Sequence, residues 1–278
     1  MDQAQPNEAD MEKYEDILFD VKNGVARITI NRPQKYNAFR GQTCEEMIDA
    51  LTKASWDKKI GVVVITGVGD KAFCTGGDQS AHDGGYDGRG MIGLPTEELQ
   101  TAIRDCPKPV IARVNGYAIG GGNVLVTCCD LAIAASTAQL GQVGPKVGSV
   151  DPGFGTAFLS RIVGEKKARE IWFMCRRYTA DQALAMGLIN AVVAPEDLDQ
   201  EVDKWCEEIL MMSPTAIAIA KRSFNADSES IRGIGGLGMQ ALALYYMTAE
   251  SKEGVEAFMG KRKPKFRDVM NGADPVSE

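Results

Sequence analysis

Three glycine-rich stretches carry the residue types best suited to chemistry. They are CTGGDQS (74–80), GYAIGGGNVL (116–125) and GQVGPKVGSVDPG (141–153). The third has four glycines and two prolines in thirteen positions, a composition that suits neither a helix nor a regular strand. It nevertheless follows a predicted buried strand and brings Ser149 and Asp151 close together. We therefore expect it to form one side of an active site.

The first two stretches could supply backbone hydrogen-bond donors. Consecutive glycines allow unusual dihedral angles and a close approach to a ligand. The run Gly120–Gly122 stands at the start of a predicted helix, where N–H groups lack intrahelical acceptors. Two such loops can direct two N–H donors at one carbonyl oxygen and form an oxyanion hole. Glycine content alone equally allows two tight turns, so this alternative stays open.

Asp151 has two compatible interpretations. Asp151-Pro152 precedes GFGTAFLSRIV, a pattern that suits a helix N-cap. The same carboxylate could act as a base.

A literal GxGxxG motif, GIGGLG (233–238), follows NADSES instead of a strand, so we do not interpret it as a dinucleotide site.

Composition limits the class of protein. A chain of 278 residues with 44% hydrophobic and 25% charged residues is typical of a globular protein with one large core. The net charge of −7 argues against nucleic-acid binding, and no apolar run approaches the length of a membrane span. The acidic N-terminus resembles no targeting peptide, which predicts a cytoplasmic location.

Histidine and cysteine content argues against a metal site. The seven cysteines form no CxxC pair, so reduced, mostly buried thiols are expected. His82 is the single histidine, and we expect it to be a solvated loop residue. No metal is predicted.

The hydrophobic pattern predicts an α/β protein. Two strands flank Asn23-Gly24, a strong hairpin signal. Buried strands are predicted at 61–67, 109–116 and 131–136, with helices at 41–57, 96–105 and 123–129 between them. Further helices are expected near 197–212, 214–224 and 236–249, and Thr179 with Gln182 forms a capping-box pattern. We predict a disordered extension (1–13), a core (14–205) and a C-terminal helical region (206–278).

Four motifs carry a resemblance to a known family: NRPQKYNAF (31–39), FCTGGD (73–78), PKPVIARVNGYAIGGG (107–122) and CDLAIAAS (129–136). From about residue 14 to 267 the chain resembles the enoyl-CoA hydratase (crotonase) superfamily. The resemblance implies a spiral of ββα units with a C-terminal helical trimerisation region, in a homotrimer or a hexamer of two trimers. It also implies that the oxyanion donors are the amides of Gly77 and Gly121.

The resemblance points away from hydratase chemistry. Val124 and Gly144 occupy the positions of the two hydratase glutamates. GQVGPKVGSVD instead resembles the branch that contains 1,4-dihydroxy-2-naphthoyl-CoA synthase and 2-ketocyclohexanecarboxyl-CoA hydrolase. That branch implies catalytic roles for four further side chains: Ser149, Asp151, Tyr246 and Tyr86. Without the resemblance, Tyr246 would be interpreted as an aromatic residue packed on a C-terminal helix.

The family pattern also implies contacts to a CoA thioester substrate. The matching residues are Arg40, Thr75, Gly76, Asp78, Gln79, Tyr117 and Gly120, with Phe258 and Lys261 contributed to the adenine and phosphate groups by a neighbouring subunit. Arg40 and Lys261 suit a solvated surface equally well. A bicarbonate site is implied at Gln142, Gly144 and Trp172, although Trp172 also suits a helix core. No tightly bound cofactor is expected.

Three details favour the hydrolase over the synthase. The loop 78–95 is shorter than the synthase pattern and lacks its basic residues, Asn123 replaces a histidine, and SVDPGFGTAFL and AIAKRSFN resemble the hydrolase. The implied reaction converts 2-oxocyclohexane-1-carbonyl-CoA and water into pimeloyl-CoA, a step in the anaerobic breakdown of alicyclic or aromatic acids. The synthase remains the alternative. A silent CoA- or RNA-binding protein is a third candidate, disfavoured by the acidic charge and by the set Ser149, Asp151 and Tyr246.

Overall fold

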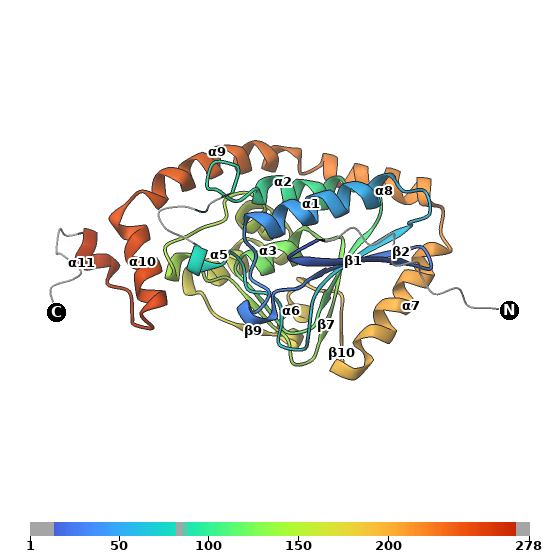
Figure 1. Ribbon diagram of the computed structural model, residues 1–278, viewed down its shortest axis with the longest axis horizontal. Helices are drawn as coiled ribbons and strands as arrows, with labels where there is room; N and C mark the ends of the chain where they lie inside the picture. Colours follow the sequence, from blue (N-terminus) through green and yellow to red (C-terminus); the bar gives the residue numbers. More distant parts are fainter. Residues whose placement is uncertain (1–13, 82–85, 87, 271–278) are drawn as a thin grey trace.

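The computed structural model describes residues 14–81, 86 and 88–270 (Figure 1). The predicted extension 1–13 and His82 lie outside these residues. The strands are β1 (Ile17–Lys22), β2 (Val25–Ile30), β3 (Val62–Gly67), β4 (Ala72–Cys74), β5 (Val110–Val114), β6 (Tyr117–Ile119), β7 (Leu131–Ala135), β8 (Gln139–Gly141), β9 (Tyr178–Thr179) and β10 (Ala191–Val193). The α-helices are α1 (Gly41–Trp56), α2 (Thr96–Asp105), α3 (Gly121–Cys128), α4 (Leu159–Val163), α5 (Glu165–Met174), α6 (Ala180–Ala185), α7 (Leu198–Leu210), α8 (Pro214–Ala226), α9 (Glu229–Tyr246), α10 (Ala249–Met259) and α11 (Phe266–Met270).

The strands form two sheets. One has the order β1-β2-β3-β5-β7-β10 and the other β4-β6-β8-β9. Strand β3 joins the first sheet, β4 joins the second, and α2 follows them in the chain. In the same way, β5 joins the first sheet, β6 joins the second, and α3 follows. This repetition is the predicted spiral of ββα units, so the fold expectation is confirmed.

The central strands of the large sheet, β3, β5 and β7, are buried on both faces. In β3, Val63 and Ile65 face the main core, whereas Val62 and Val64 face the opposite side. Helix α7 covers that side with a stripe that includes Val202, while α1 packs on β1 and β2 on the other (Figure 1). Burial on both faces explains why the parallel strands are continuously hydrophobic in sequence.

Two local predictions are confirmed by geometry. Asn23 and Gly24 both have positive φ angles, 52° and 81°, as a two-residue hairpin turn requires. The Thr179 N–H donates to Gln182 Oε1 at 3.0 Å, and the Thr179 hydroxyl accepts from the Gln182 N–H.

The predicted boundary at residue 206 is wrong because it falls inside α7. Leu198, Val202 and Cys206 of that helix belong to the core against the sheet. Helices α8 to α11 follow α7 and reach the far end of the molecule (Figure 1). Of these, α9 still contributes Ile231, Met239, Leu242 and Tyr246 to the main core.

Helix α9 also begins earlier than predicted and contains the glycines of GIGGLG. A Cβ at Gly153 would lie only 2.8 Å from Gly235 Cα, so this close helix contact requires glycine. Tertiary packing therefore overrides the low helix propensity of the stretch.

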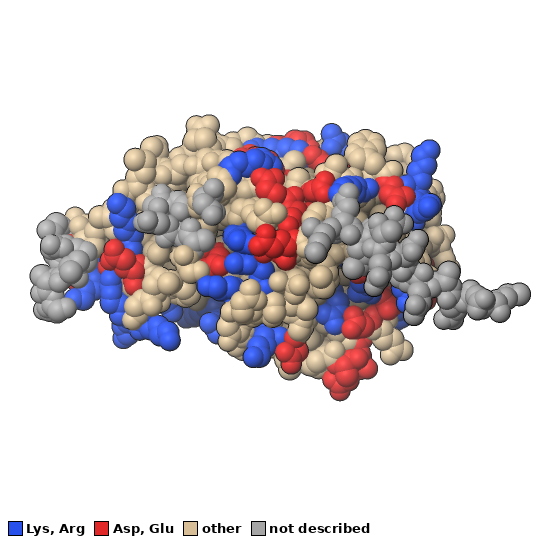
Figure 2. Space-filling view, in the orientation of Figure 1, with Lys and Arg blue, Asp and Glu red and all other residues tan. Residues whose placement is uncertain are grey.

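The surface gives no sign of a basic binding face in the view shown. Figure 2 shows acidic and basic side chains intermixed on this face. Within the described ranges, no helix is both long and apolar enough to span a membrane.

Candidate active site

All three glycine-rich stretches line one cavity of about 630 Å³. Gly76 and Gly77 come from the first stretch, and Gly120 and Gly121 from the second. Residues of the third, from Gln142 to Asp151, form another part of the wall. The fold therefore brings together segments that are separated by tens of residues in the sequence.

Hydrogen bonding determines where the amide of Gly77 points. Phe39 N–H donates to Gly76 O at 2.8 Å, and Asp78 N–H donates to Phe39 O at 2.9 Å. Peptide groups alternate in direction along extended backbone, so the Gly77 N–H points away from Phe39. Gly77 itself lines the cavity, which leaves its amide available to a ligand.

The amide of Gly121 is available for a different reason. Gly121 is the first residue of α3, so its N–H has no acceptor within the helix. A Cβ at Gly76 would lie 2.8 Å from this nitrogen, and Gly76 has a φ of 87°. The two loops are thus in direct contact, and glycine at position 76 makes that contact possible.

Ser149 and Tyr246 form a hydroxyl pair in the cavity wall. Ser149 Oγ and the Tyr246 hydroxyl oxygen are 2.8 Å apart, although the residues are 97 positions apart in the chain. Tyr246 is 4% exposed, and burial raises its pKa to about 12. Tyr246 therefore stays protonated at neutral pH and remains a hydrogen-bond donor.

Asp151 is half-buried and has a hydrogen bond to each carboxylate oxygen. Gly155 N–H donates to Oδ1 at 2.8 Å, and Gln100 Nε2 donates to Oδ2 at 2.7 Å. Burial raises the pKa of Asp151 to about 6, against the lowering effect of these donors. A carboxylate with such a pKa is ionised at neutral pH and basic enough for proton transfer.

The predicted N-cap role of Asp151 is partly correct. The π-helical turn η5 (Phe154–Phe158) has Gly153 as its N-cap, so the helix starts two residues later than expected. The Asp151 carboxylate still accepts one of its first N–H groups, that of Gly155. Gly153 has a φ of 98°, and this turn separates Asp151 from the helix.

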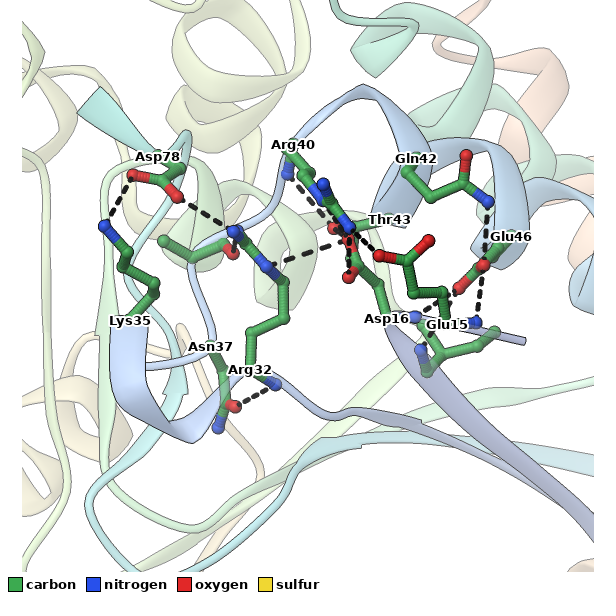
Figure 3. Close-up of polar contacts among 12 residues, drawn as sticks. Glu15, Asp16, Arg32, Lys35, Asn37, Arg40, Gln42, Thr43, Glu46 and Asp78 are labelled. Carbon is green, nitrogen blue, oxygen red and sulfur yellow. Dashed lines mark hydrogen bonds and ion pairs between the residues drawn. The ribbon is translucent and has the colours of Figure 1, made fainter. Parts of the chain in front are cut away.

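Asp78 has a contrasting environment in the same cavity. Arg32 donates to its Oδ2 at 2.9 Å (Figure 3). The Ser80 hydroxyl donates to its Oδ1 at 2.6 Å. Burial raises the pKa of Asp78, but these partners outweigh it and hold the pKa below its ordinary value. Asp78 is therefore a permanent anion that fixes the glycine-rich loop.

Two cations and two tyrosines lie together along another part of the wall. The rings of Tyr36 and Tyr117 meet edge to face at 6.5 Å, and the Arg177 guanidinium lies 5.3 Å from the Tyr117 ring. Lys35 Nζ donates to Ser80 Oγ at 2.8 Å. Aromatic faces beside basic groups can hold the adenine and phosphates of a nucleotide.

Most of the predicted site residues line this cavity. They are Thr75, Gly76, Gly77, Asp78, Gln79, Tyr86, Tyr117, Gly120, Gly121, Gln142, Gly144, Ser149, Asp151, Trp172, Tyr246 and Phe258. Gln79 Nε2 donates to the Tyr86 hydroxyl at 3.1 Å, and burial raises the pKa of that phenol.

Arg40 is placed elsewhere by the structure. Its guanidinium forms ion pairs with Asp16, at 2.8 Å from Nε to Oδ2, and with Glu15 (Figure 3). It is absent from the cavity wall. The contact to CoA implied by the resemblance is therefore not seen, because local carboxylates engage the charge.

The two C-terminal residues differ in their relation to this cavity. Phe258 lines the cavity of its own chain, whereas Lys261 does not line it. Helix α10 is held near the site because Ser251 Oγ donates to Gly148 O at 2.7 Å. This hydrogen bond holds α10 beside the cavity, and Phe258 of the same helix lines the cavity wall.

The three residues of the implied bicarbonate site lie close together. Gln142 Nε2 is buried without a hydrogen-bond partner among the described residues. A Cβ at Gly144 would lie 3.0 Å from the Trp172 ring and 2.6 Å from Ser149 O. The Trp172 N–H, however, donates to Gly155 O. Gln142 thus offers a donor to an anion, whereas Trp172 does not.

Three residues near the site were missed from the sequence. Lys35 and Arg177 stand in basic, exposed contexts that do not identify them. Gln100 is buried on the apolar face of α2. The polar side chain of Gln100 on an apolar helix face was the one signal in the sequence, because a buried polar group must find a hydrogen-bond partner.

The chain matches a known protein family over most of its length. Residues 20–269 match the family model for enoyl-CoA hydratase/isomerase. The chain belongs to the enoyl-CoA hydratase/isomerase family. It is accordingly a member of a superfamily of enzymes that process acyl-CoA thioesters.

Solved structures of this family agree with the assignment. An enoyl-CoA hydratase from Mycobacterium avium subsp. paratuberculosis is 28% identical with a TM-score of 0.82, and the match covers 91% of this chain and 99% of that one. A carnitinyl-CoA hydratase from Mycobacterium avium is 31% identical, with a TM-score of 0.78 and coverage of 90% and 97%. An enoyl-CoA hydratase from Bacillus anthracis is 31% identical, with a TM-score of 0.69 and coverage of 91% and 99%. These three family members carry hydratase names, and none is named as a ring-opening hydrolase or a ring-closing synthase.

Proposed function

We propose that this protein opens the ring of a cyclic β-keto acyl-CoA by adding water to its carbon–carbon bond. The proposed reaction converts 2-oxocyclohexane-1-carbonyl-CoA and water into pimeloyl-CoA. The supporting observation is that Ser149, Tyr246 and Asp151 share one cavity with the amides of Gly77 and Gly121. At the positions that the resemblance assigns to hydratase glutamates, this chain has Val124 and Gly144.

The reaction begins with water attacking the ring ketone. The ionised Asp151 carboxylate takes a proton from water, and the resulting hydroxide attacks the ketone carbon. The ketone oxygen becomes negative and accepts hydrogen bonds from the Ser149 and Tyr246 hydroxyls. This step forms a tetrahedral alkoxide.

Collapse of the alkoxide breaks the ring. The bond between the former ketone carbon and the α-carbon of the thioester breaks, and its electron pair forms the thioester enolate. The N–H groups of Gly77 and Gly121 stabilise the enolate oxygen. The former ketone carbon becomes a carboxyl group, and the α-carbon takes the proton held by Asp151. The thioester stays intact, so no oxidant or second reactant is needed.

The electrostatics near Asp151 favour an uncharged ring. Apolar side chains of the cavity wall include Leu94, Val147 and Leu242. The cavity wall has two described cations: Lys35 contacts Ser80, and Arg177 contacts Tyr117. Neither cation shifts the pKa of Asp151. The succinylbenzoyl-CoA substrate of the synthase carries a free carboxylate, which such an acyl site would not neutralise.

Bicarbonate is not needed as the base in this scheme. Trp172 donates its N–H to Gly155, which leaves Gln142 as the side-chain donor of the implied set. Because Gln142, Gly144 and Trp172 together offer bicarbonate only one side-chain donor, we assign the proton transfers to Asp151.

A comparative assay tests the proposal. The purified protein is incubated with 2-oxocyclohexane-1-carbonyl-CoA and, separately, with succinylbenzoyl-CoA, and products are identified by mass. Formation of pimeloyl-CoA from the first alone is expected. Consumption of the second alone would establish the synthase instead, and consumption of neither would favour a CoA-binding protein.

We also propose that the protein assembles as a trimer or as a pair of trimers. The C-terminal helices expose large apolar side chains that assembly would cover, among them Phe224 (78%), Leu237 (71%) and Met247 (72%). Light scattering after gel filtration should give three or six times the chain mass of 30.0 kDa. A monomer would contradict this part of the proposal.

A further inference from the structure

Helix α2 holds the segment that carries Asp151 at two points. Gln100 donates to the carboxylate, and one turn later Arg104 stacks on Phe158, with its guanidinium carbon 4.1 Å from the ring centre. Arg104 also lies 5.6 Å from the Phe154 ring. Residues four apart lie on the same helix face, so both contacts come from one surface of α2.

The helix is itself anchored by contacts to the C-terminal helices. Arg104 donates to Ser228 Oγ at 2.8 Å, and Arg232 of α9 donates to Asp105 at 2.9 Å. Gln100 is 4% exposed and does not line the cavity. Its amide is therefore fixed behind the carboxylate, out of reach of a substrate.

Gly155 fixes the other carboxylate oxygen. A Cβ at Gly155 would lie 2.6 Å from the Asp151 Cβ, so the carboxylate occupies the space that a side chain would need. Because each carboxylate oxygen accepts one hydrogen bond, the orientation of the carboxylate plane is fixed. The remaining lone pairs are left for a molecule in the cavity.

We infer that Gln100 is a positioning residue that orients the Asp151 carboxylate and favours its ionised form. The inference rests on the proposed function, since it assumes that Asp151 acts as a base. Gln100 is a neutral donor, so it stabilises the anion without forming an ion pair. An arginine or lysine at the same place would bind the carboxylate more strongly and lower its basicity.

The other groups that face Asp151 act in known directions. Glu97 of α2 raises the pKa of Asp151 by repulsion. Cys128 of α3 and Tyr246 of α9 have raised pKa values and stay neutral at neutral pH. Arg104, the neighbouring cation on α2, stacks on aromatic rings and is not among the groups that shift Asp151. Gln100 and the Gly155 amide are thus the donors that keep the carboxylate ionised.

The test replaces Gln100 and follows the titration of Asp151. Gln100→Met has similar length but no donor, and should raise the apparent pKa of Asp151 by about one unit. Gln100→Glu keeps the shape of the side chain and is used if the Met variant fails to fold. It should raise the apparent pKa of Asp151 further, because two adjacent carboxyl groups then share a proton. Arg104→Met is the control, since it loosens the same segment but leaves both hydrogen-bond donors to Asp151 in place.

Two readouts separate this inference from the proposed function. The first is the pH titration of the Asp151 carboxyl ¹³C resonance, assigned by its absence in Asp151→Asn, and it needs no substrate. The second is the acid limb of kcat/KM for ring opening, which should move by the same amount. An unmoved titration in both Gln100 variants would overturn the inference, even if activity fell. A shifted titration in a protein that opens no ring would support the positioning role and contradict the proposed function.

Discussion

Asp78 and Asp151 line the same cavity, yet their surroundings give them opposite properties. Asp78 is paired with Arg32 and Ser80, which hold its pKa below the ordinary value. Asp151 has two neutral donors and, among the described residues, no cation, and burial raises its pKa to about 6. A carboxylate thus becomes a base through the absence of a counter-ion as much as through burial.

Removing the carboxylate of Asp151 should produce the largest effect. Asp151→Asn should lower kcat for ring opening by about 10³-fold, because the proton acceptor is lost. Asparagine can still accept the Gly155 N–H, so the free energy of unfolding at pH 7 should not fall. Steady-state kinetics and urea unfolding measure the two effects. Retained activity, or loss of the fold, would refute the assignment of Asp151 as the base.

The corresponding change at Asp78 should affect stability first. Asp78→Asn removes the nearer of two charged partners of the buried Arg32, since Asp16 lies farther away at 3.7 Å, and should lower the free energy of unfolding by about 3 kcal/mol. Urea unfolding at pH 7 measures this loss. If the variant were as stable as wild type but inactive, Asp78 would be part of the chemistry and the contrast with Asp151 would fail.

The hydroxyl pair should have a smaller catalytic effect. Tyr246→Phe removes one donor to the developing alkoxide and should lower kcat by about 10²-fold, while Ser149 remains. Tyr245→Phe is a matched control, because Tyr245 is adjacent in sequence but does not line the cavity. Equal losses in the two variants would show a packing effect and not hydrogen bonding.

The two aspartates should also affect stability in opposite directions as pH changes. The raised pKa of Asp151 contributes stability below pH 4 that is lost as pH rises through about 6, a change of about 3 kcal/mol. The lowered pKa of Asp78 contributes stability above pH 4 that is lost as pH falls further.

Urea unfolding of wild type and Asp151→Asn between pH 4.5 and 7.5 isolates the Asp151 effect, since asparagine does not titrate. The stability of the variant relative to wild type should increase with pH. A constant difference would mean that the pKa of Asp151 is ordinary.

The sequence predicted the parts of this site that depend on local pattern. The hairpin at Asn23-Gly24, the buried strands and the glycine loops at 77 and 121 follow from backbone preferences within a few residues. Ser149 and Asp151 attracted attention because the segment that carries them, 141–153, suits neither a helix nor a regular strand.

What could not be predicted depends on partners distant in sequence. Gln100 meets a carboxylate 51 positions away, and Arg40 is neutralised by Asp16, 24 positions upstream. The sequence predicted a helix only from about residue 236, yet α9 begins at Glu229 and its Gly235 packs closely on Gly153. Such contacts become visible only when the fold is known.

In the proposed reaction, water cleaves a carbon–carbon bond while the thioester survives. Ring opening of 2-oxocyclohexane-1-carbonyl-CoA in H₂¹⁸O, followed by mass spectrometry of the product, distinguishes this reaction from thioester hydrolysis. We expect pimeloyl-CoA with one ¹⁸O atom in the free carboxylate and an unlabelled thioester. Release of free CoA, with ¹⁸O in the carboxylate formed from the thioester, would contradict it.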